Sequence, residues 1–326
     1  MDDQRIDGID VPDLVAIAQT QAALLPYVRT TPVFETSLPS DIKAAFKLEM
    51  LQAAGTFKAR GAFSNLLGLD DAQRAAGVTC VSAGNHAVAV AYAAMVLGIS
   101  AKVVMLATAN PARVALCQKF GAQIIMEADG ALGFARVGQI QADEGRFFVH
   151  PFNGYRTILG TATLGAEWAH QAGPLDALVL PIGGGGLAAG VATAFKLLQP
   201  DIEIIGVEPT GAASMARSFA ENGPIKMGPM QSIADSLMAP HTEAYSFGLC
   251  RRYIDRLITV DDTQIRGAMR FLFEELKLAV EPACAVATAA TLGPLRQTLV
   301  GTRVGVLLCG SNTDAATFAS HIGNLT

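Results

Sequence analysis

The stretch LPIGGGGLAAG, Leu180 to Gly190, places four consecutive glycines between an apolar run and an alanine-rich run. The apolar run is typical of a buried strand and the alanine-rich run of a helix, so the glycines mark a strand-to-helix turn. Backbone N–H groups at such a turn suit a phosphate dianion, whose approach a β-carbon would obstruct. A tight turn that only lets helix and strand pack closely is the alternative.

Two nucleotide motifs compete for the same turn. Gly183, Gly185 and Ala188 satisfy the pattern G-x-G-x-x-A, and Glu208 follows the next strand, as in nicotinamide dinucleotide sites. This short pattern leaves a nicotinamide-dependent oxidoreductase open as a distant alternative. A P-loop is excluded, because the run lacks the Gly-Lys-Ser/Thr ending that grips terminal phosphates and magnesium.

Short β-branched runs alternate with alanine-rich segments along the chain. The runs cover residues 101–106, 122–127, 146–151, 176–182, 202–209, 256–262 and 303–310. Apolar runs of this length, separated by amphipathic segments, predict buried parallel strands with crossover helices, which is an α/β fold. At 326 residues the chain exceeds the usual domain size of about 100–200 residues, so we expect two lobes.

Composition favours a protein that acts on small molecules. The net charge of -5 gives no basic surface for nucleic acid or for an anionic membrane. No apolar stretch reaches the roughly 18 residues that span a bilayer, and the N-terminus lacks the order of a secretory signal, so we expect a cytoplasmic protein. Five dispersed cysteines without a Cys-x-x-Cys pair argue against a disulfide framework and a zinc site.

Two further segments carry candidate chemistry. In GTFKARGA, residues 55–62, Lys58 lies in a mostly apolar setting that would lower its pKa and make its amine a nucleophile. A lysine that snorkels from a helix face is the ordinary alternative. In SAGNHAVAVAYAA, residues 82–94, a small polar turn precedes a helix, and Ser82, Asn85 and His86 suit a carboxylate. A plain helix N-cap with a structural histidine is the alternative there.

A lysine nucleophile, a carboxylate-binding turn and a phosphate cradle together describe pyridoxal-phosphate chemistry. The chain resembles the fold-type II pyridoxal-phosphate enzymes, in particular the serine/threonine dehydratase (threonine ammonia-lyase) and serine racemase branch. The resemblance covers most of the chain through the ordered motifs GTFKARGA, SAGNHA, VHPF, LPIGGGGLAAG, VEP, SIAD, VEPACA and LLCGSN. It implies a tryptophan synthase β-like α/β fold with two open, twisted, mainly parallel sheets flanked by helices. The implied domains are a large one, 1–75 and 150–326, and a small mobile one, 76–149.

The resemblance also implies a role for each motif. Lys58 would carry the pyridoxal 5′-phosphate and remove the Cα proton of the substrate, with Phe57 packed on the cofactor ring. The residues implied for the phosphate are Gly183, Gly184, Gly185, Gly186 and Leu187. Asn85 would bond the cofactor's 3′-oxygen. The residues implied for the amino-acid substrate are Ser82, Ala83, Gly84, Asn85, His86 and Thr161.

Two cofactor-facing residues have ordinary alternatives. Glu281 falls where the family has a carboxylate beside the cofactor, but a glutamate before a proline is also typical of an exposed helix start. Cys309 stands where the family usually has a serine facing the pyridine nitrogen, or it is a small buried residue that ends a core strand. A neutral thiol there would make the ring a weaker electron sink, which favours prompt loss of a β leaving group.

The implied reaction is β-elimination from a 3-hydroxy-L-amino acid of the threonine/serine class, giving a 2-oxo acid and ammonia. Racemases of the branch have a serine acid/base at the position of Ala83, so racemisation is a weaker alternative, as is β-replacement. Thr161 and Ala162 replace a glutamine and a glycine that are common in the family. With Phe152 and Tyr155 nearby, this change favours a bulkier substrate such as 3-phenylserine, unless those rings only pack in the core.

The resemblance carries three further expectations. Relatives with a divalent cation use a glutamate at the position of Glu208 and an aspartate shortly after it, where this chain has Ser214. Fewer oxygen charges mean weaker Mg²⁺ or Ca²⁺ binding, so we expect no strong metal requirement. The short segment after CGSN suggests no regulatory domain and a role in amino acid catabolism. A homodimer is usual for the family.

Overall fold

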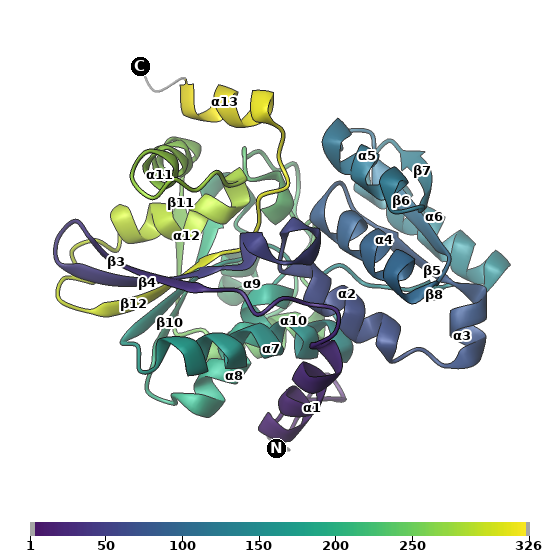
Figure 1. The fold of residues 1–326 in the computed structure, drawn as a ribbon, viewed down its shortest axis with the longest axis horizontal. Coiled ribbons are helices and arrows are strands. Elements are labelled where there is room, and N and C mark those ends of the chain that lie inside the picture. Colours follow the sequence, from purple (N-terminus) through teal and green to yellow (C-terminus); the bar gives the residue numbers. More distant parts are fainter. Residues whose placement is uncertain (1–3, 324–326) are drawn as a thin grey trace.

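The computed structural model describes residues 4–323 and contains two main sheets that lie side by side (Figure 1). The larger sheet has six strands in the order β11-β10-β9-β12-β4-β3. Its strands are β3 (Val33–Leu38), β4 (Ile42–Leu48), β9 (Ala177–Pro181), β10 (Glu203–Pro209), β11 (Arg256–Val260) and β12 (Arg303–Leu308). All neighbours are parallel except β3, which pairs antiparallel with β4 at one edge.

The second sheet has four parallel strands in the order β7-β6-β5-β8. Its strands are β5 (Val78–Val81), β6 (Ala101–Leu106), β7 (Gln123–Glu127) and β8 (Phe147–Phe148). A two-stranded antiparallel ribbon of β1 (Arg5–Ile6) and β2 (Ile9–Asp10) lies near the N-terminus.

Helices cover both faces of the two sheets. The α-helices are α1 (Leu14–Leu24), α2 (Lys58–Leu67), α3 (Asp71–Ala76), α4 (Asn85–Leu97), α5 (Pro111–Lys119), α6 (Gly130–Glu144), α7 (Tyr155–Ala172), α8 (Gly186–Leu198), α9 (Ser214–Ala220), α10 (Ala244–Tyr253), α11 (Asp262–Glu274), α12 (Pro282–Leu292) and α13 (Ala315–Gly323). Four short 3-10 helices are η1 (Glu49–Leu51), η2 (Ala53–Gly55), η3 (Thr210–Ala212) and η4 (Asp235–Leu237). No helix within residues 4–323 is long and apolar enough to cross a membrane.

The predicted α/β class with two mainly parallel sheets is confirmed. Each of the seven apolar runs contains a strand, whereas β3, β4 and β5 were missed. All four strands of the second sheet lie within the predicted small domain, 76–149. Helix α2 lies outside that range, yet its Phe63 and Leu66 are buried in one core with Val88 and Val103. The division into a large and a small mobile domain stays a prediction.

Helices α7 and α8 pack closely because glycines face the contact. A β-carbon on Gly190 of α8 would lie 2.1 Å from the Thr161 hydroxyl, and one on Gly165 of α7 would lie 2.8 Å from the Val191 carbonyl oxygen. Distances under about 3 Å are impossible for real carbons, so the helices depend on these missing side chains. Gly160 in the same way brings α7 against α2, which carries the candidate lysine, because a β-carbon there would lie 2.6 Å from the Arg60 carbonyl oxygen.

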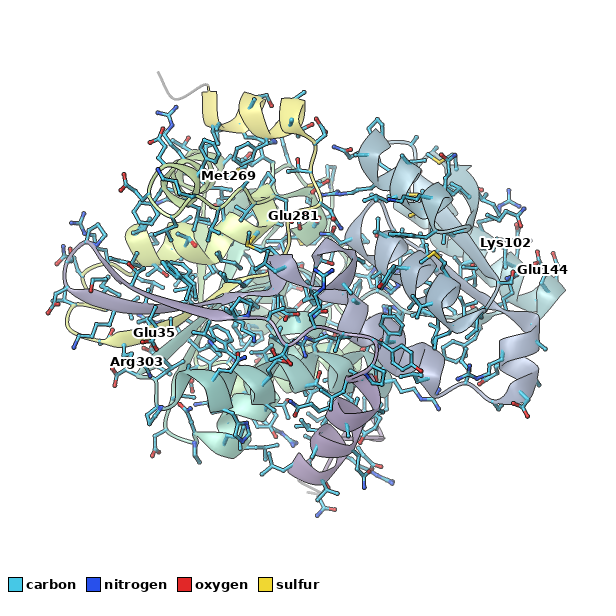
Figure 2. All side chains as sticks on the ribbon, in the orientation of Figure 1. Glu35, Lys102, Glu144, Met269, Glu281 and Arg303 are labelled. Carbon is cyan, nitrogen blue, oxygen red and sulfur yellow. The ribbon has the colours of Figure 1, made fainter. Side chains whose placement is uncertain are left out.

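Charged side chains are buried beneath α2. Lys47 of β4 lies 2.5 Å from Glu167 of α7, and Arg60 of α2 lies 2.9 Å from the other oxygen of Glu167. Arg60 also pairs with Glu49 at 2.8 Å. Buried ions are tolerated when they are fully paired, so this network fixes α2 against the large sheet. Other ion pairs lie at opposite ends of the molecule, Glu35 with Arg303 and Lys102 with Glu144 (Figure 2).

Candidate active site

A cavity of about 180 Å³ is lined by residues from both main sheets. Three of the predicted motifs border it: the segment around Lys58, the turn at residues 82–86 and the glycines at residues 183–186. Glu281 and Cys309 border it as well. The carboxyl ends of parallel strands, where strand-to-helix turns gather, are the usual place for a ligand in this class of sheet.

Lys58 is the first residue of α2, and its amine donates a hydrogen bond to the carbonyl of Pro151. The amine lies 5.1 Å from the ring centroid of Phe57, whose own backbone N–H bonds the carbonyl of Cys309 at 3.1 Å. Burial lowers the pKa of Lys58 to about 8. The amine is therefore far easier to deprotonate than an exposed lysine, as the sequence predicted for a nucleophile.

The glycine turn joins β9 to α8. A β-carbon on Gly184 would lie 2.3 Å from the Phe152 ring, one on Gly186 would lie 2.4 Å from the Phe152 carbonyl oxygen, and one on Gly183 would lie 3.0 Å from the backbone of Leu237. Gly185 has a φ of +92°, a backbone conformation that favours glycine. The protein's own packing thus requires the glycines, which is the alternative that the sequence left open.

The same turn also has the donors that a phosphate needs. Within residues 4–323, the backbone N–H groups of Gly183, Gly184 and Gly185 have no hydrogen-bond acceptor. They precede the N-terminus of α8, a 13-residue helix, and border the cavity. The positive end of the helix dipole and free N–H groups together favour an anion. The packing requirement and the phosphate cradle are therefore compatible.

The turn at residues 82–86 joins β5 to α4. The backbone N–H of Gly84 donates to the Ser82 hydroxyl at 3.0 Å, which closes the turn, and Ala83 borders the cavity beside it. The ring Nε2 of His86 bonds the carbonyl of Val149 at 2.8 Å. Burial and the nearby Lys58 lower the pKa of His86 to about 3, so the ring is neutral and acts as a donor to that carbonyl.

Asn85 is held by a polar network that reaches the other sheet. Its side-chain nitrogen donates to Glu281 at 2.6 Å, and its oxygen accepts from Asn312 at 3.0 Å. Glu281 is fully buried, not exposed as its helix-start alternative required. Burial raises the pKa of Glu281 to about 7, against the opposing effect of Arg113. In Figure 2 Glu281 lies near the middle of the molecule, beside the boundary between the two sheets.

Arg113 of α5 is a site residue that sequence reasoning missed. Its guanidinium lies 2.6 Å from Asp235 and 3.3 Å from Glu281, and its Nε donates to the carbonyl of Asn312 at 2.9 Å. The side chain is buried and borders the cavity. Its three partners lie far away in the sequence, so no local pattern could identify it. Asp235 belongs to the quoted motif SIAD, for which no role was predicted.

Cys309 directly follows β12 and borders the cavity. Its neighbour Cys284 and burial raise the pKa of its thiol well above the ordinary value, so the thiol is neutral. All five cysteines are free and buried. A neutral partner at this position agrees with the electronic property that the sequence suggested for it.

The side chains of Thr161 and Glu208 make hydrogen bonds outside the main cavity. The Thr161 hydroxyl donates to the carbonyl of Gly186 at 2.8 Å, and the residue borders a small pocket behind Lys58, outside the main cavity. Glu208 accepts from the backbone N–H groups of Met215 and Ala216 at 2.7 Å each, so it caps the start of α9. This buried carboxylate is already satisfied and lies outside the cavity lining, unlike the ribose ligand of a dinucleotide site.

Comparison with known proteins agrees with the geometry. The family model described as "Pyridoxal-phosphate dependent enzyme" matches residues 24–310. A phenylserine dehydratase from Ralstonia pickettii is 66% identical over 98% of this chain and 99% of its own length. A serine racemase from Oryza sativa subsp. indica is 36% identical over 93% of this chain and 91% of its own length.

Two solved structures share the fold over nearly the whole chain. Maize serine racemase superposes with a TM-score of 0.90 at 36% identity, covering 96% of this chain and 97% of its own. A threonine deaminase from Solanum lycopersicum, in its processed form, gives a TM-score of 0.87 at 27% identity, covering 98% of this chain and 96% of its own.

The residues present fit pyridoxal 5′-phosphate. A lysine with a lowered pKa, free N–H donors at a helix start and a neutral thiol border one cavity. These match the aldehyde, the phosphate and the pyridine ring of that cofactor. The family match over residues 24–310 rules against the alternative of a nicotinamide-dependent oxidoreductase. The chain belongs to the family of pyridoxal-phosphate dependent enzymes.

Proposed function

We propose that this enzyme dehydrates a 3-hydroxy-L-amino acid to a 2-oxo acid and ammonia, and that 3-phenylserine is its preferred substrate. The name of the Ralstonia pickettii relative supports the substrate, since 66% identity extends over nearly both chains. The observation that carries the reaction type is the position of Lys58. Its amine borders a cavity between one turn suited to a carboxylate and another suited to a phosphate.

When bound, pyridoxal 5′-phosphate withdraws electrons from the Cα of an attached amino acid and so acidifies the Cα proton. Lys58 is proposed to hold the cofactor through its Nζ and, once released, to take that proton. A pKa of about 8 leaves the free amine able to accept and return a proton near neutral pH. The carbonyl of Pro151, which accepts from the amine, fixes the direction of Nζ.

The two turns orient the reactants in this proposal. The N–H groups of Gly183, Gly184 and Gly185 hold the cofactor phosphate, and Leu187 and Gly186 complete the cradle. The turn of residues 82–86 holds the substrate carboxylate, and Asn85 bonds the cofactor's 3′-oxygen, with Glu281 and Asn312 fixing its amide. Cys309, as a neutral thiol, would face the pyridine nitrogen of the bound cofactor. Thr161 acts indirectly, through its bond to Gly186.

Racemisation and β-replacement are the weaker candidates. Racemisation needs a proton donor on the face of Cα opposite the lysine, and the cavity lining offers Ala83 in the turn where a serine would be required. A methyl group transfers no proton. In the elimination, Lys58 takes the Cα proton and returns a proton to the β-hydroxyl, which leaves as water, so no second acid/base group is required.

Measurement of 2-oxo acid release tests the proposal. The purified enzyme is assayed with 3-phenylserine, L-threonine, L-serine and 3-hydroxyaspartate. We expect the strongest release from 3-phenylserine, and a yellow colour of the protein that borohydride abolishes. Lys58→Ala should lose release by more than about a thousandfold, whereas the exposed Lys43→Ala should match wild type. Undiminished turnover in Lys58→Ala would overturn the mechanism, and silence on all four substrates would overturn the reaction.

We also propose that the enzyme is a cytoplasmic homodimer whose smaller lobe, residues 76–149, moves when substrate binds. The five free cysteines agree with a reducing compartment. Mass measurement in solution tests the dimer. Small-angle scattering with and without substrate tests the movement, which should reduce the radius of gyration.

A further inference from the structure

We propose that Phe134 and Phe152 form the wall that receives the substituent on the substrate's β-carbon, and that Glu243 positions this wall through His150 and His241. The inference rests on the proposed function and names the residues that select an aromatic substrate. None of the five was assigned to the predicted binding site, although the motif VHPF contains His150 and Phe152, and Phe152 was linked to a bulkier substrate.

The cavity is polar at the predicted cofactor turns and apolar elsewhere. The apolar side chains that border it away from those turns are Val81, Leu106, Phe134, Phe152, Leu237, Met238 and Pro240. Phe134 is half-buried on α6, whereas Phe152 is buried against the glycine turn. The ring of a phenyl group removed from water against such side chains gains both apolar burial and ring contacts.

Charge in the cavity disfavours an acidic substituent. Besides Lys58, the only Lys or Arg that borders the cavity within residues 4–323 is Arg113. Its guanidinium is already paired with Asp235 and Glu281. His86 is neutral, since its pKa is about 3. A carboxylate on the β-carbon would therefore be repelled by two acidic groups, with no free cation to balance its charge. A phenyl ring carries no charge and avoids this cost.

The two phenylalanines are backed by two imidazoles. The ring centroid of Phe134 lies 5.4 Å from that of His241 and 6.2 Å from that of His150. The ring centroid of Phe152 lies 5.6 Å from that of His241 and 4.7 Å from that of His150, the latter edge to face. Phe134 lies on α6, which packs on the four-stranded sheet, and His241 lies in the loop before α10. The cluster thus joins the two parts that border the cavity.

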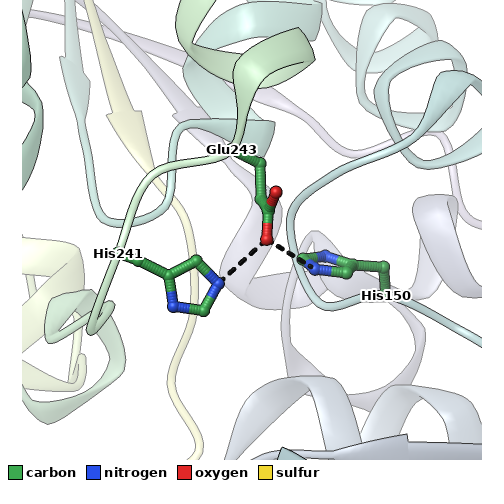
Figure 3. Close-up of side chains that lie close together, drawn as sticks. All are labelled: His150, His241 and Glu243. Atoms are coloured by element: carbon green, nitrogen blue, oxygen red, sulfur yellow. Dashed lines mark hydrogen bonds and ion pairs between the residues drawn. The ribbon is translucent and has the colours of Figure 1, made fainter. Parts of the chain in front are cut away.

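Glu243 lies between both imidazoles and is hydrogen-bonded to one of them (Figure 3). Its carboxylate accepts from His241 Nε2 at 3.0 Å and lies 3.7 Å from His150 Nε2. On its other side, His150 Nδ1 accepts from the backbone N–H groups of Phe152 and Asn153, at 3.3 and 3.0 Å. Burial lowers the pKa of His150, so the ring is neutral, and its proton sits on Nε2 on the side of Glu243. His150 in this way couples Glu243 to the backbone of Phe152.

The same three side chains are close enough to be considered as metal ligands. A metal at His150 Nε2 would displace the proton that this ring carries, while Nδ1 remains an acceptor of two N–H groups. Metal-bound histidines ordinarily donate through their second nitrogen. The hydrogen-bonding pattern favours a positioning role, and it leaves the metal as an outcome that the experiment can reveal.

The holoenzyme and its variants are compared on 3-phenylserine and L-threonine. Phe134→Ala should lower kcat/KM for 3-phenylserine about tenfold through KM, and should change kcat/KM for threonine less than about threefold. The inhibition constant of L-phenylalanine, which has the ring but no hydroxyl, should rise by a similar factor. Leu132→Ala, an exposed residue on the same helix, is the matched control and should change neither.

Glu243→Ala should lower kcat/KM for 3-phenylserine about threefold to tenfold with threonine nearly unchanged, and Glu243→Gln, which keeps an acceptor, should restore most of it. Equal losses on both substrates would overturn the inference, as would full activity of Phe134→Ala on 3-phenylserine. Zn²⁺ inhibition of wild type that Glu243→Ala abolishes would replace the positioning role by a metal site. If wild type dehydrates threonine but not 3-phenylserine, the proposed substrate fails first, before any variant is compared.

Discussion

The turns at residues 82–86 and 183–186 occupy equivalent places in their two sheets, but they are held in different ways. Each lies between a parallel strand and a helix, and each borders the cavity. Close packing constrains the glycine turn, since a β-carbon on Gly184 or Gly186 would enter Phe152, and neutral hydroxyl groups donate to its carbonyls. Hydrogen bonds and ion pairs hold the other turn, through Asn85, Glu281 and Arg113.

This difference bears on the proposed movement of the smaller lobe, residues 76–149. Closely packed segments resist small displacements, so we expect the glycine turn to keep its position when a ligand binds. The polar contacts of Asn85 and Arg113 with Glu281 run between the two sheets, so they would have to rearrange in that movement. Under our proposal of a mobile smaller lobe, the turn of residues 82–86 would travel with its sheet while the glycine turn stays in place.

We expect the largest loss of stability from removing Arg113, which belongs to the polar network around the turn of residues 82–86. Arg113→Met leaves Asp235 and the buried Glu281 without their cation, and it should lower the free energy of unfolding by about 3 kcal/mol. Urea unfolding measures the loss. The control Arg136→Met removes an exposed pair with Glu127 and should change stability by less than about 0.5 kcal/mol. Equal stabilities of the two variants would mean that the polar network does not hold its turn.

Filling the glycine turn should have the next largest effect. Gly184→Ala places a carbon 2.3 Å from the Phe152 ring and should cost about 1–3 kcal/mol of stability, together with most of the bound cofactor. Gly138→Ala on α6 is the control, because nothing lies within 4 Å of its new carbon. It should stabilise the protein by about 0.5–1 kcal/mol. Full cofactor content in Gly184→Ala, measured by absorbance, would contradict the packing account.

The smallest effect is a pH dependence of stability that two buried carboxyl groups share. Burial raises the pKa of Glu281, in the polar network, and of Glu208, at the end of β10, each to about 7. A carboxyl with a raised pKa binds more protons when folded, so its contribution to stability falls as the pH rises from about 4.5 to about 7. Glu281→Gln and Glu208→Gln should each flatten this slope in urea unfolding at pH 5 and pH 8.

The two glutamate variants should differ in catalysis. Glu281→Gln alters the group that holds Asn85, so the pH profile of the substrate KM should change between pH 5 and pH 8. Glu208 caps α9 away from the cavity, so Glu208→Gln should keep the wild-type profile. Identical profiles for both variants would show that Glu281 does not act on the turn of residues 82–86.

The sequence predicted most of the fold because a buried strand has a local signature. The edge strand β3 was not predicted, because VFETSL mixes polar and apolar residues and most of its side chains are accessible to solvent. The strand β4 contains Lys47, whose burial depends on Glu167, 120 residues further along the chain. A charged residue in a strand is taken to be exposed to solvent when its ion-pair partner is not known. Only the folded chain shows that the pair is buried.

The site was predictable where a motif is contiguous and not where a contact spans the chain. Lys58, Ser82, Asn85, Glu281 and Cys309 all border the cavity, as their motifs suggested. Thr161 does not, because its hydroxyl is bound to Gly186. Phe134 carries no signal in the sequence, since one phenylalanine on an amphipathic helix is typical of a core residue. Its neighbours His150 and His241 come from distant segments.

The glycines between α7 and α8 limit how this enzyme can be altered. In a saturation library, positions 165 and 190 should accept almost no replacement, because any side chain meets the facing helix. Positions 106 and 134 border the cavity from the layer of the four-stranded sheet. New substrate preferences are therefore expected to arise by mutation at such cavity positions, while the packing of α7 on α8 is inherited unchanged.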